Sequence, residues 1–334
     1  KNKINVLTGG PGTGKTHTIK SICITLMRKG FTVKLLAPTG KAAQRLSEST
    51  KIEAETLHRF LKIMPKKGDS DFMNDNDNNE NEEVIKESLI IIDESSMLEL
   101  SVVNVLLKRI NPLTTAILFV GDIDQLPPVG AGNFFGDIIN SNLINVCRLG
   151  QLHRSDTDGI INQNAIKVKN KENIILENRK DFEFHDVRRN EDISTRVKEI
   201  YQSLIDSKVS NMDIQVLVPM KDVELGCNEM NSLLRPIGNK NFNSFDKPSK
   251  ILVGDKVMQT VNNYELEVFN GDTGIVNDYN PSDDSTSVMF NNMSKIYNYD
   301  KQSLAELMLA YCITIHKSQG SDYQYVIIPL VGRH

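Results

Sequence analysis

The feature that most constrains the fold is the stretch GGPGTGKT at positions 9–16. It matches the pattern GxxxxGK[ST] in full, with a short apolar run before it and a helix-like pattern after it. Glycines allow backbone N–H groups to turn inward around phosphate oxygens, and the start of the helix presents its positive end to the same anion. A glycine-rich turn without a ligand is the alternative, but the full match in this context favours a phosphate-binding loop.

Two side chains of the loop have specific expected roles. Lys15 should reach the β- and γ-phosphates of a nucleoside triphosphate, and the hydroxyl of Thr16 should bind Mg²⁺. The cofactors that we expect are therefore ATP and Mg²⁺. The predicted nucleotide contacts of this region are Gly10, Pro11, Gly12, Thr13, Gly14, Lys15, Thr16 and His17.

A pair of carboxylates follows the apolar run LIII at 89–92. Ligands of parallel sheets bind at the carboxyl ends of the strands, so Asp93 and Glu94 are expected beside the phosphate loop. Asp93 would hold Mg²⁺, and Glu94 would polarise the attacking water. A solvated acidic turn is the alternative. Together with the loop, the pair predicts an NTPase, a class that still includes kinases, switches, loaders and motors.

Short apolar runs alternate with helix-period segments, which predicts α/β architecture with parallel sheets covered by helices. In the first 150 residues the expected strands are 4–8, 33–37, 89–92, 116–120 and 144–148, and the expected helices are 15–29, 40–49, 97–110 and 133–141. A second α/β set is expected to have helices near 158–169, 191–206 and 226–235 and strands at 214–218 and 325–330. Residues 250–303 show β-type runs separated by Gly, Asn, Asp and Pro, which predicts a small all-β insertion.

Composition excludes some classes of protein. With 334 residues, 39% hydrophobic and 25% charged, the chain is long enough for two or three globular domains. No apolar run approaches the roughly 20 residues that span a bilayer, and the chain opens on KNK and a strand, so we expect neither a membrane partner nor a signal peptide. The four cysteines are far apart and lack metal spacing, which favours reduced thiols in a cytoplasmic protein.

The net charge of −4 is unevenly distributed. Residues 66–87 hold three lysines and eight carboxylates, a net −5, so the remainder of the chain stands at +1. The sum neither supports nor excludes binding to DNA, because a near-neutral protein can carry a basic cleft. The Asn- and Asp-rich piece at 69–83 is too polar to pack and is predicted to be a mobile insertion.

Several short segments, taken in order and spacing, resemble the helicases of superfamily 1. The segments are GGPGTGKT, APTGKAA, DESSM, GDIDQLPPVG, GDKVMQT, VFNGDTG and TIHKSQGS. They are most similar to the RecD-like family of 5′→3′ DNA helicases, and the similarity covers nearly the whole chain. The resemblance implies an ATP-dependent motor on single-stranded DNA that couples ATP hydrolysis to duplex unwinding in DNA repair and recombination.

The resemblance also implies a domain organisation. Residues 1–150 would form a first RecA-like ATPase domain, with the acidic insertion 62–88 at the position of the family's wedge hairpin. Residues 151–250 and 304–334 would form a second RecA-like domain, and 251–303 a small barrel-like β insertion within it. A segment as negative as the insertion would repel the DNA backbone, so a poor wedge and a loop at the tip of a wedge both remain open.

Further roles follow from the resemblance rather than from spacing. Gln125 would sense the γ-phosphate and link it to DNA, since an amide can donate to phosphate and accept from water. Arg154 would be an arginine finger that makes hydrolysis depend on domain closure. Gly320 and Ser321 would approach the nucleotide from the second domain. A loop glutamine and a surface arginine are the alternatives for Gln125 and Arg154.

The implied single-strand track follows the phosphate backbone without reading sequence. Its predicted DNA-binding residues are Pro38, Thr39, Lys41, Thr56, His58, Asn133, Thr314, His316 and Lys317. Phe60, Tyr264 and Phe269 could stack bases, although an isolated aromatic is more often a core residue. The expected partners are single-stranded DNA and duplex junctions, with nuclease-complex subunits or a single-strand binding protein as candidates.

Two features of the family are not found in the sequence. These are an adenine-contacting glutamine before the phosphate loop and an arginine motif after TIHKSQGS, and Arg333 does not stand in such a motif. We therefore expect a fragment that hydrolyses ATP poorly by itself. Two other functions stay open: the helicase part of a conjugative relaxase or nuclease complex, and an ATP-switched DNA-binding scaffold that does not move.

Overall fold

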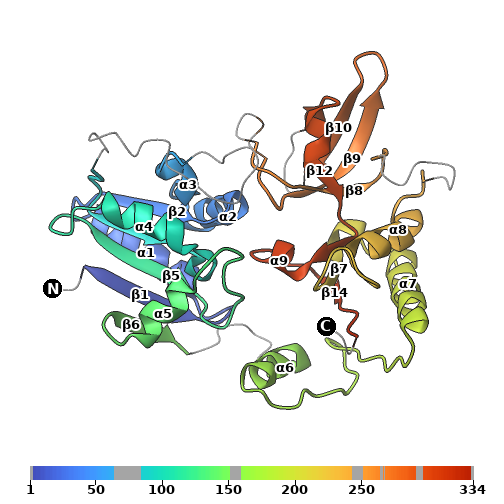
Figure 1. The fold of residues 1–334 in the computed structure, drawn as a ribbon, viewed down its shortest axis with the longest axis horizontal. Coiled ribbons are helices and arrows are strands. Elements are labelled where there is room, and N and C mark those ends of the chain that lie inside the picture. The colour runs from blue at the N-terminus through green and yellow to red at the C-terminus, as the bar shows by residue number, and fades with distance from the viewer. Residues whose placement is uncertain are drawn as a thin grey trace. The chain divides into compact units, whose positions relative to one another are not determined.

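The computed structural model describes residues 3–63, 84–150, 159–242, 251–263, 266, 268–290 and 296–331. Contacts divide the chain into two units, residues 1–184 and 185–334, which are considered one at a time (Figure 1). The domain boundary at 150/151 rests on sequence grounds and stays a prediction. Among the described helices we find none that is both long enough and apolar enough to cross a bilayer.

The first unit is built on a six-stranded parallel sheet, ordered β3-β2-β4-β5-β1-β6 (Figure 1). Its strands are β1 (Ile4–Gly9), β2 (Val33–Ala37), β3 (Ala54–Thr56), β4 (Leu89–Ile92), β5 (Ala116–Gly121) and β6 (Asn145–Leu149). Because β1 lies between β5 and β6, the phosphate loop leaves the sheet from an interior strand. The predicted parallel P-loop sheet is confirmed.

Helices cover both faces of this sheet. They are α1 (Lys15–Met27), α2 (Gly40–Thr50), α3 (Leu57–Phe60), α4 (Leu100–Lys108) and α5 (Phe134–Asn140). A further helix of this unit, α6 (Ile160–Lys169), is not part of these layers (Figure 1). Successive strand residues point to opposite faces, so Leu7 packs with α1 and α2, whereas Val6 packs with α4 and α5. Burial of both faces explains why the strands read as continuous apolar runs.

Two parts of the first unit differ from the sequence prediction. The helix expected over 97–110 is instead a 3₁₀ turn, η1 (Ser95–Met97), followed by α4, which begins at Leu100. The short elements β3 and α3 were not predicted, because three and four residues are too few to show a hydrophobic period. The other predicted strands and helices of this unit start and end within a few residues of their expected positions.

The second unit contains a three-stranded parallel sheet, ordered β13-β7-β14. Its strands are β7 (Ile214–Val218), β13 (Cys312–Thr314) and β14 (Tyr325–Ile327). The helices of the unit are α7 (Asn190–Asp206), α8 (Cys227–Gly238) and α9 (Ile315–Ser318), and a short 3₁₀ turn, η2 (Asn211–Asp213), precedes β7. The strand predicted at 325–330 is shorter than expected, and β13 was not predicted. A second full RecA-like domain stays a prediction.

A five-stranded antiparallel sheet, ordered β11-β10-β9-β8-β12, lies in the same unit. Its elements are β8 (Lys256–Gln259), β9 (Thr273–Asn280), β10 (Ser285–Phe290), β11 (Ile296–Tyr299), η3 (Ser303–Glu306) and β12 (Leu307–Leu309). The β-type runs of the sequence therefore do form a small sheet, and its last strand continues through Ala310 and Tyr311 directly into β13.

Buried polar side chains join this antiparallel sheet to the parallel one. Asp255, fully buried before β8, accepts hydrogen bonds at Oδ1 from Arg235 Nε (2.9 Å), Asn239 Nδ2 (2.9 Å) and the Tyr311 hydroxyl (3.0 Å). A second guanidinium nitrogen of Arg235 lies 2.5 Å from Oδ2. On β8 itself, Lys256 Nζ donates to the carbonyl of Ile214 at 2.7 Å. The two sheets of the unit thus share one hydrogen-bonded interior.

Replacing Arg235 by Leu should destabilise the second unit strongly. The change leaves the carboxylate of Asp255 buried without its cation, which costs about 3–5 kcal/mol. Urea unfolding at pH 7 measures the loss. The control is Arg196→Leu, which breaks the exposed pair with Glu199 and should cost less than about 1 kcal/mol. If both variants lost the same free energy of unfolding, the buried pair would stabilise the protein no more than the exposed pair does.

Candidate active site

The phosphate loop occupies the turn between β1 and α1. Gly12 and Gly14 have φ angles of 76° and 89°, a region that side chains with a Cβ rarely enter, so both positions require glycine. The Lys15 ammonium lies against the loop and donates to the carbonyls of Gly9 (2.6 Å) and Gly10 (3.0 Å). Lys15 must therefore exchange these carbonyls for phosphate oxygens when a nucleotide binds.

The two leading glycines of the loop differ in their surroundings. A Cβ on Gly9 would lie 2.6 Å from Thr13 Oγ1 and 2.9 Å from the carbonyl oxygen of Leu149, whereas a Cβ on Gly10 would meet no atom within 4 Å. Thr13 itself is buried and donates to the carbonyl of Gly10 at 2.8 Å. Gly9 is therefore required for the loop to close onto β6, and Gly10 is not.

Asp93 and Glu94 follow β4, two strands away from the loop's own strand. Burial raises the pKa of Asp93, and both its bond from the Glu94 amide and the charge of Lys15 oppose that shift. Burial, and then the charge of Asp93, raise the pKa of Glu94 to about 7, while Lys15 again lowers it. The ammonium of Lys15 is thus within electrostatic reach of both carboxylates, as the sequence predicted.

The backbone of Glu94 is held in the left-handed region at φ 51°, which turns the chain from β4 into η1. Within the part of the chain that the structure describes, Glu94 Oε2 is buried and makes no hydrogen bond. Such an oxygen fits a group that positions water or a cation. Mg²⁺ favours one or two carboxylates together with phosphate oxygens and water, so the donor set of Thr16 and Asp93 fits this ion.

Gln125 lies in the loop after β5 and is connected to the same turn. Its backbone N–H donates to the carbonyl of Asp122 at 3.2 Å, and its side-chain Oε1 accepts from Ser96 Oγ at 3.4 Å. Ser96 is the third residue after Asp93, so the structure brings Lys15, Asp93, Glu94 and Gln125 to one edge of the sheet. Of the other predicted nucleotide contacts, Thr16 is half-buried at the start of α1, whereas Pro11 and His17 are exposed.

Three of the predicted DNA contacts cap helices with hydrogen bonds from their side chains. Thr39 Oγ1 accepts from the amide of Ala42 at the start of α2, Thr56 Oγ1 from Arg59 in α3, and Asn133 Oδ1 from Gly136 in α5. Capping occupies an acceptor but leaves the hydroxyl hydrogen of Thr39 and the amide hydrogens of Asn133 available for a phosphate. Thr56 is only 3% exposed, so it would need local opening to touch DNA.

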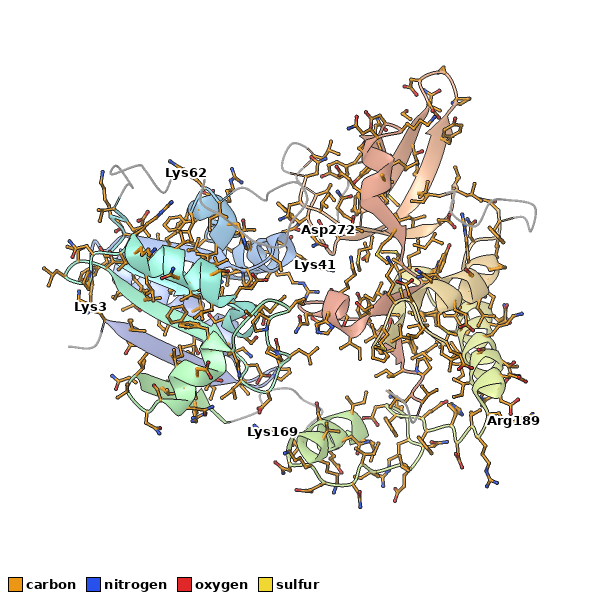
Figure 2. All side chains as sticks on the ribbon, viewed as in Figure 1. Lys3, Lys41, Lys62, Lys169, Arg189 and Asp272 are labelled. Carbon is orange, nitrogen blue, oxygen red and sulfur yellow. The ribbon has the colours of Figure 1, made fainter. Side chains whose placement is uncertain are left out.

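Three further predicted contacts lie around these caps. Pro38 and Lys41 flank Thr39 at the start of α2, where Lys41 is half-buried (Figure 2). His58 in α3 is also half-buried, and burial lowers its pKa against the opposing charge of Glu99. A histidine that is neutral at pH 7 would contact DNA through hydrogen bonds and not as a cation.

The remaining predicted contacts belong to the second unit, around α9. Thr314 occupies the N-cap position of α9, His316 is exposed, and Lys317 is half-buried. Burial, aided by the charge of Lys221, lowers the pKa of Lys317, and Cys227 opposes it. Just after α9, Gly320 has φ 70° and the amide of Ser321 bonds back to the carbonyl of Ser318 at 2.9 Å.

Some predictions fall outside the described residues. Arg154, Tyr264 and most of the acidic insertion cannot be placed for this reason. Phe60 is half-buried and packs against the core of the first unit, with Lys34 Nζ 5.9 Å from its ring centroid. That packing favours a structural role over base stacking. Phe269 is half-buried, and its amide donates to Asp272 at 2.8 Å.

Sequence reasoning missed two residues beside the site. Ser96 contacts Gln125, and Glu99 packs so closely on Gly130 that a Cβ there would lie 2.5 Å from its carboxyl carbon. Both lie in the segment SSMLE at 95–99, directly after the carboxylate pair. This segment gives no sign of a role in the sequence, because its contacts are with residues of the loop at 121–133.

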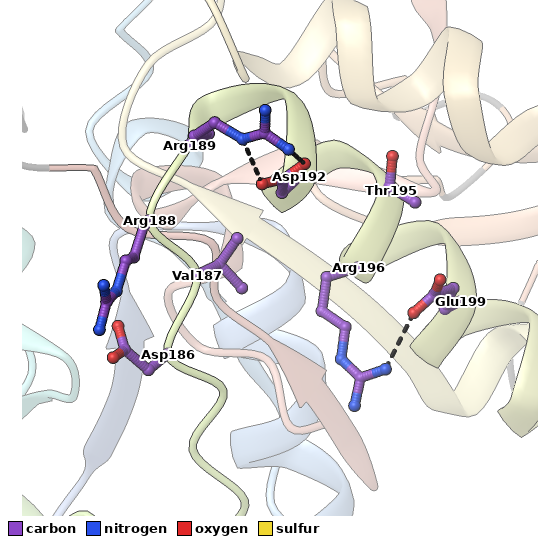
Figure 3. A pocket seen from close by; sticks show the side chains of 8 residues that line it. All are labelled: Asp186, Val187, Arg188, Arg189, Asp192, Thr195, Arg196 and Glu199. Atoms are coloured by element: carbon purple, nitrogen blue, oxygen red, sulfur yellow. Dashed lines mark hydrogen bonds and ion pairs between the residues drawn. The ribbon is translucent and has the colours of Figure 1, made fainter.

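A polar hollow of about 730 Å³ lies on the second unit at the start of α7 (Figure 3). It is lined by three arginines and three carboxylates, with Arg189 paired to Asp192 and Arg196 to Glu199. The charges balance within the hollow, so an anion would gain little by entering it. We assign it no part in the nucleotide site.

Comparison with known proteins identifies the family. Residues 1–131 match the family described as AAA domain, and residues 229–290 match the ATP-dependent RecD-like DNA helicase SH3 domain. The ATP-dependent RecD2 DNA helicase of Deinococcus radiodurans is 31% identical over 342 residues, covering 100% of this chain. The chain belongs to the RecD-like helicases of superfamily 1. The second of these ranges contains most of α8 and the strands β8, β9 and β10 of the antiparallel sheet.

This RecD-like chain also resembles other curated proteins. An uncharacterized protein of Methanocaldococcus jannaschii is 31% identical over 406 residues, covering 98% of the chain, and the RecD subunit of the RecBCD enzyme of Buchnera aphidicola is 28% identical over 408 residues, covering 100% of the chain and 66% of that subunit. The chain spans 44% of the Deinococcus protein and 34% of the Methanocaldococcus protein.

Solved structures agree at the level of the fold. The Pif1 helicase from Bacteroides in complex with ADP-AlF3 and ssDNA superposes with a TM-score of 0.58 at 20% identity, covering 99% of this chain and 83% of the other. The Pif1 helicase from Candida albicans gives 0.53 at 18% identity, covering 97% and 84%.

Gly9→Ala should destabilise the chain, whereas Gly10→Ala should not. The added methyl group on Gly9 must displace Thr13 or the Leu149 backbone, and overpacking of this kind costs about 1–3 kcal/mol. Thermal unfolding without nucleotide measures both variants. Equal melting temperatures for the two would contradict the asymmetry of the loop.

Glu94→Gln should stabilise the nucleotide-free protein at high pH. The folded-state pKa of about 7 stands above the ordinary 4.5, so the folded chain holds this proton more tightly than the unfolded chain. The wild type therefore loses stability as the pH rises from about 4.5 to 7, by up to about 3 kcal/mol, and Gln removes that loss. Unfolding of both proteins at pH 4 and pH 8 checks this: the variant should gain only at pH 8.

Proposed function

We propose that the chain is the motor part of an ATP-dependent DNA helicase that translocates 5′→3′ on single-stranded DNA. The observation that carries the proposal is the edge of the six-stranded sheet, where the charge of Lys15 acts on Asp93 and Glu94 and Gln125 bonds to the turn that follows them. A loop for phosphates, a buried carboxylate for water and an amide bonded to the turn that carries this carboxylate fit the requirements of triphosphate hydrolysis.

In this mechanism the residues of the first unit act in sequence. Lys15 leaves the carbonyls of Gly9 and Gly10 and binds the β- and γ-phosphates, whose negative charge offsets the favourable effect of the ammonium on the two carboxylates. Glu94, ionised above its raised pKa, accepts a proton from the attacking water. Bound Mg²⁺, held by Thr16 and Asp93, would neutralise charge on the phosphate oxygens.

The second RecA-like domain completes the proposed mechanism. Arg154 serves as the arginine finger, and Gly320 and Ser321 approach the nucleotide from the far side. Because Thr314, His316 and Lys317 lie beside that last pair, ATP binding and grip on the DNA are coupled through one segment. ATP draws the two lobes together, hydrolysis lets them part, and each lobe grips the strand in turn.

The nucleic-acid substrate is proposed from the relatives and from the site together. The relatives include a DNA helicase and a subunit of the RecBCD enzyme, and solved Pif1 structures with similar folds hold ssDNA or concern forked dsDNA. The caps Thr39 and Asn133, together with the start of α2, supply donors for phosphates without base-specific contacts. The role in DNA repair and recombination, in the cytoplasm, belongs to the same proposal.

Lys15→Ala should abolish ATP hydrolysis and unwinding while leaving DNA binding intact. The variant removes the cation that neutralises the β- and γ-phosphates but leaves the strand track untouched. ATPase rates with and without oligothymidine, together with fluorescence anisotropy on labelled single strands, measure both effects. The control is Lys20→Ala on the same helix, whose ammonium contacts the carbonyl of Ser49.

The outcomes separate the competing functions. A wild-type chain, extended at both ends, that binds DNA and ATP but never unwinds a forked duplex would support the switched scaffold and overturn the motor. A steep fall of DNA affinity with salt is expected if phosphates dominate the contact.

A further inference from the structure

We propose that Ser96 is a positioning residue that sets the orientation of the Gln125 amide. Ser96 Oγ donates to Gln125 Oε1 at 3.4 Å, across 29 residues of sequence. Among the described residues, Ser96 is the side chain with which Gln125 forms a hydrogen bond. The inference rests on the proposed function, in which Gln125 faces the γ-phosphate.

The two ends of a glutamine amide have opposite polarity. The Nε2 end donates two hydrogen bonds and suits a phosphate, whereas the Oε1 end accepts and would repel one. Rotation by half a turn exchanges the two ends, so a free amide presents the wrong end for part of the time. A hydroxyl that donates to Oε1 selects the rotamer whose N–H groups remain for the phosphate.

Ser96 is held firmly enough to act in this way. It is 5% exposed and stands in the η1 turn, whose direction is set by the left-handed backbone of Glu94. Gly121, at the end of β5, lets the turn lie directly against the strand: a Cβ there would be 3.1 Å from the Ser96 nitrogen and from the Phe135 ring. The backbone position from which the Ser96 hydroxyl extends is therefore fixed.

The Gln125 loop has a fixed backbone but a long side chain. Asp122 Oδ1 accepts from the amide of Asp124 at 3.0 Å, and the Asp122 carbonyl accepts from the amide of Gln125. These bonds place Cα of Gln125 without deciding its side-chain rotamer. The hydrogen bond from Ser96 supplies the missing restraint on that rotamer. Because Ser96 stands in the turn that follows Glu94, a shift of Glu94 would also move the amide of Gln125.

The neighbouring serine provides a matched control. Ser95 Oγ donates to the carbonyl of Ile92 at 2.7 Å within its own turn. Ser95→Ala removes a buried hydroxyl of the same size one residue away, without touching Gln125. A general loss of packing in the turn would affect both variants equally.

The test compares DNA-stimulated ATPase of the wild type, Ser96→Ala, Ser95→Ala, Gln125→Ala and the Ser96–Gln125 double variant. Ser96→Ala should lower the stimulated kcat about three- to tenfold, the range expected for one neutral hydrogen bond, with the ATP KM and melting temperature little changed. Once Gln125 is Ala, the additional change at Ser96 should have no effect. Additive losses in the double variant, or equal losses from Ser95→Ala, would overturn the positioning role.

A second measurement does not depend on turnover. In protein labelled with ¹⁵N-glutamine, Ser96→Ala should shift or broaden the side-chain amide resonances of Gln125 without nucleotide, and Ser95→Ala should leave them in place. Unchanged resonances in Ser96→Ala would refute the contact. If a wild-type chain extended at both ends shows no stimulation by DNA, the proposed function fails, and these resonances alone decide the inference.

Discussion

Two carboxylates buried at the end of one strand and held close to a single ammonium are the constraint on which the first unit depends. Desolvation opposes the ionisation of Asp93 and Glu94, and the charge of Asp93 makes the ionisation of Glu94 harder still. Lys15 offsets part of this, but it also bonds to two loop carbonyls. The charges of the loop and of the carboxylate pair are therefore balanced only in part, which suits a ligand that brings both anionic phosphates and a cation.

Several residues that are predicted to touch DNA also have a structural role. Thr39, Thr56 and Asn133 each fix the first turn of a helix by giving an acceptor to a backbone N–H. A side chain at an N-cap is therefore needed for folding before it is needed for binding. Sequence resemblance cannot separate these two reasons for a polar residue, but burial can, as the nearly inaccessible Thr56 illustrates.

The sequence was enough to predict the parallel sheet, because its strands are buried on both faces and read as uninterrupted apolar runs. It was also enough to expect Lys15, Asp93 and Glu94 at one edge of the sheet, since the carboxyl ends of its parallel strands all lie there, while their roles stay predictions. It could not predict the bond between Ser96 and Gln125, which joins segments 29 residues apart, nor the short β3 and α3. The raised pKa of Glu94 likewise depends on burial that only the folded chain creates.

The buried pair of Arg235 and Asp255 has a consequence for modular exchange. The antiparallel sheet could be taken for a module that can be exchanged alone. However, Asp255, just before its first strand, pairs with Arg235 of α8, and its last strand continues into β13. A chimera that imports this sheet from a relative must therefore import the facing side of α8 with it. We expect α8 and the antiparallel sheet to be exchanged between relatives only as a single segment of structure.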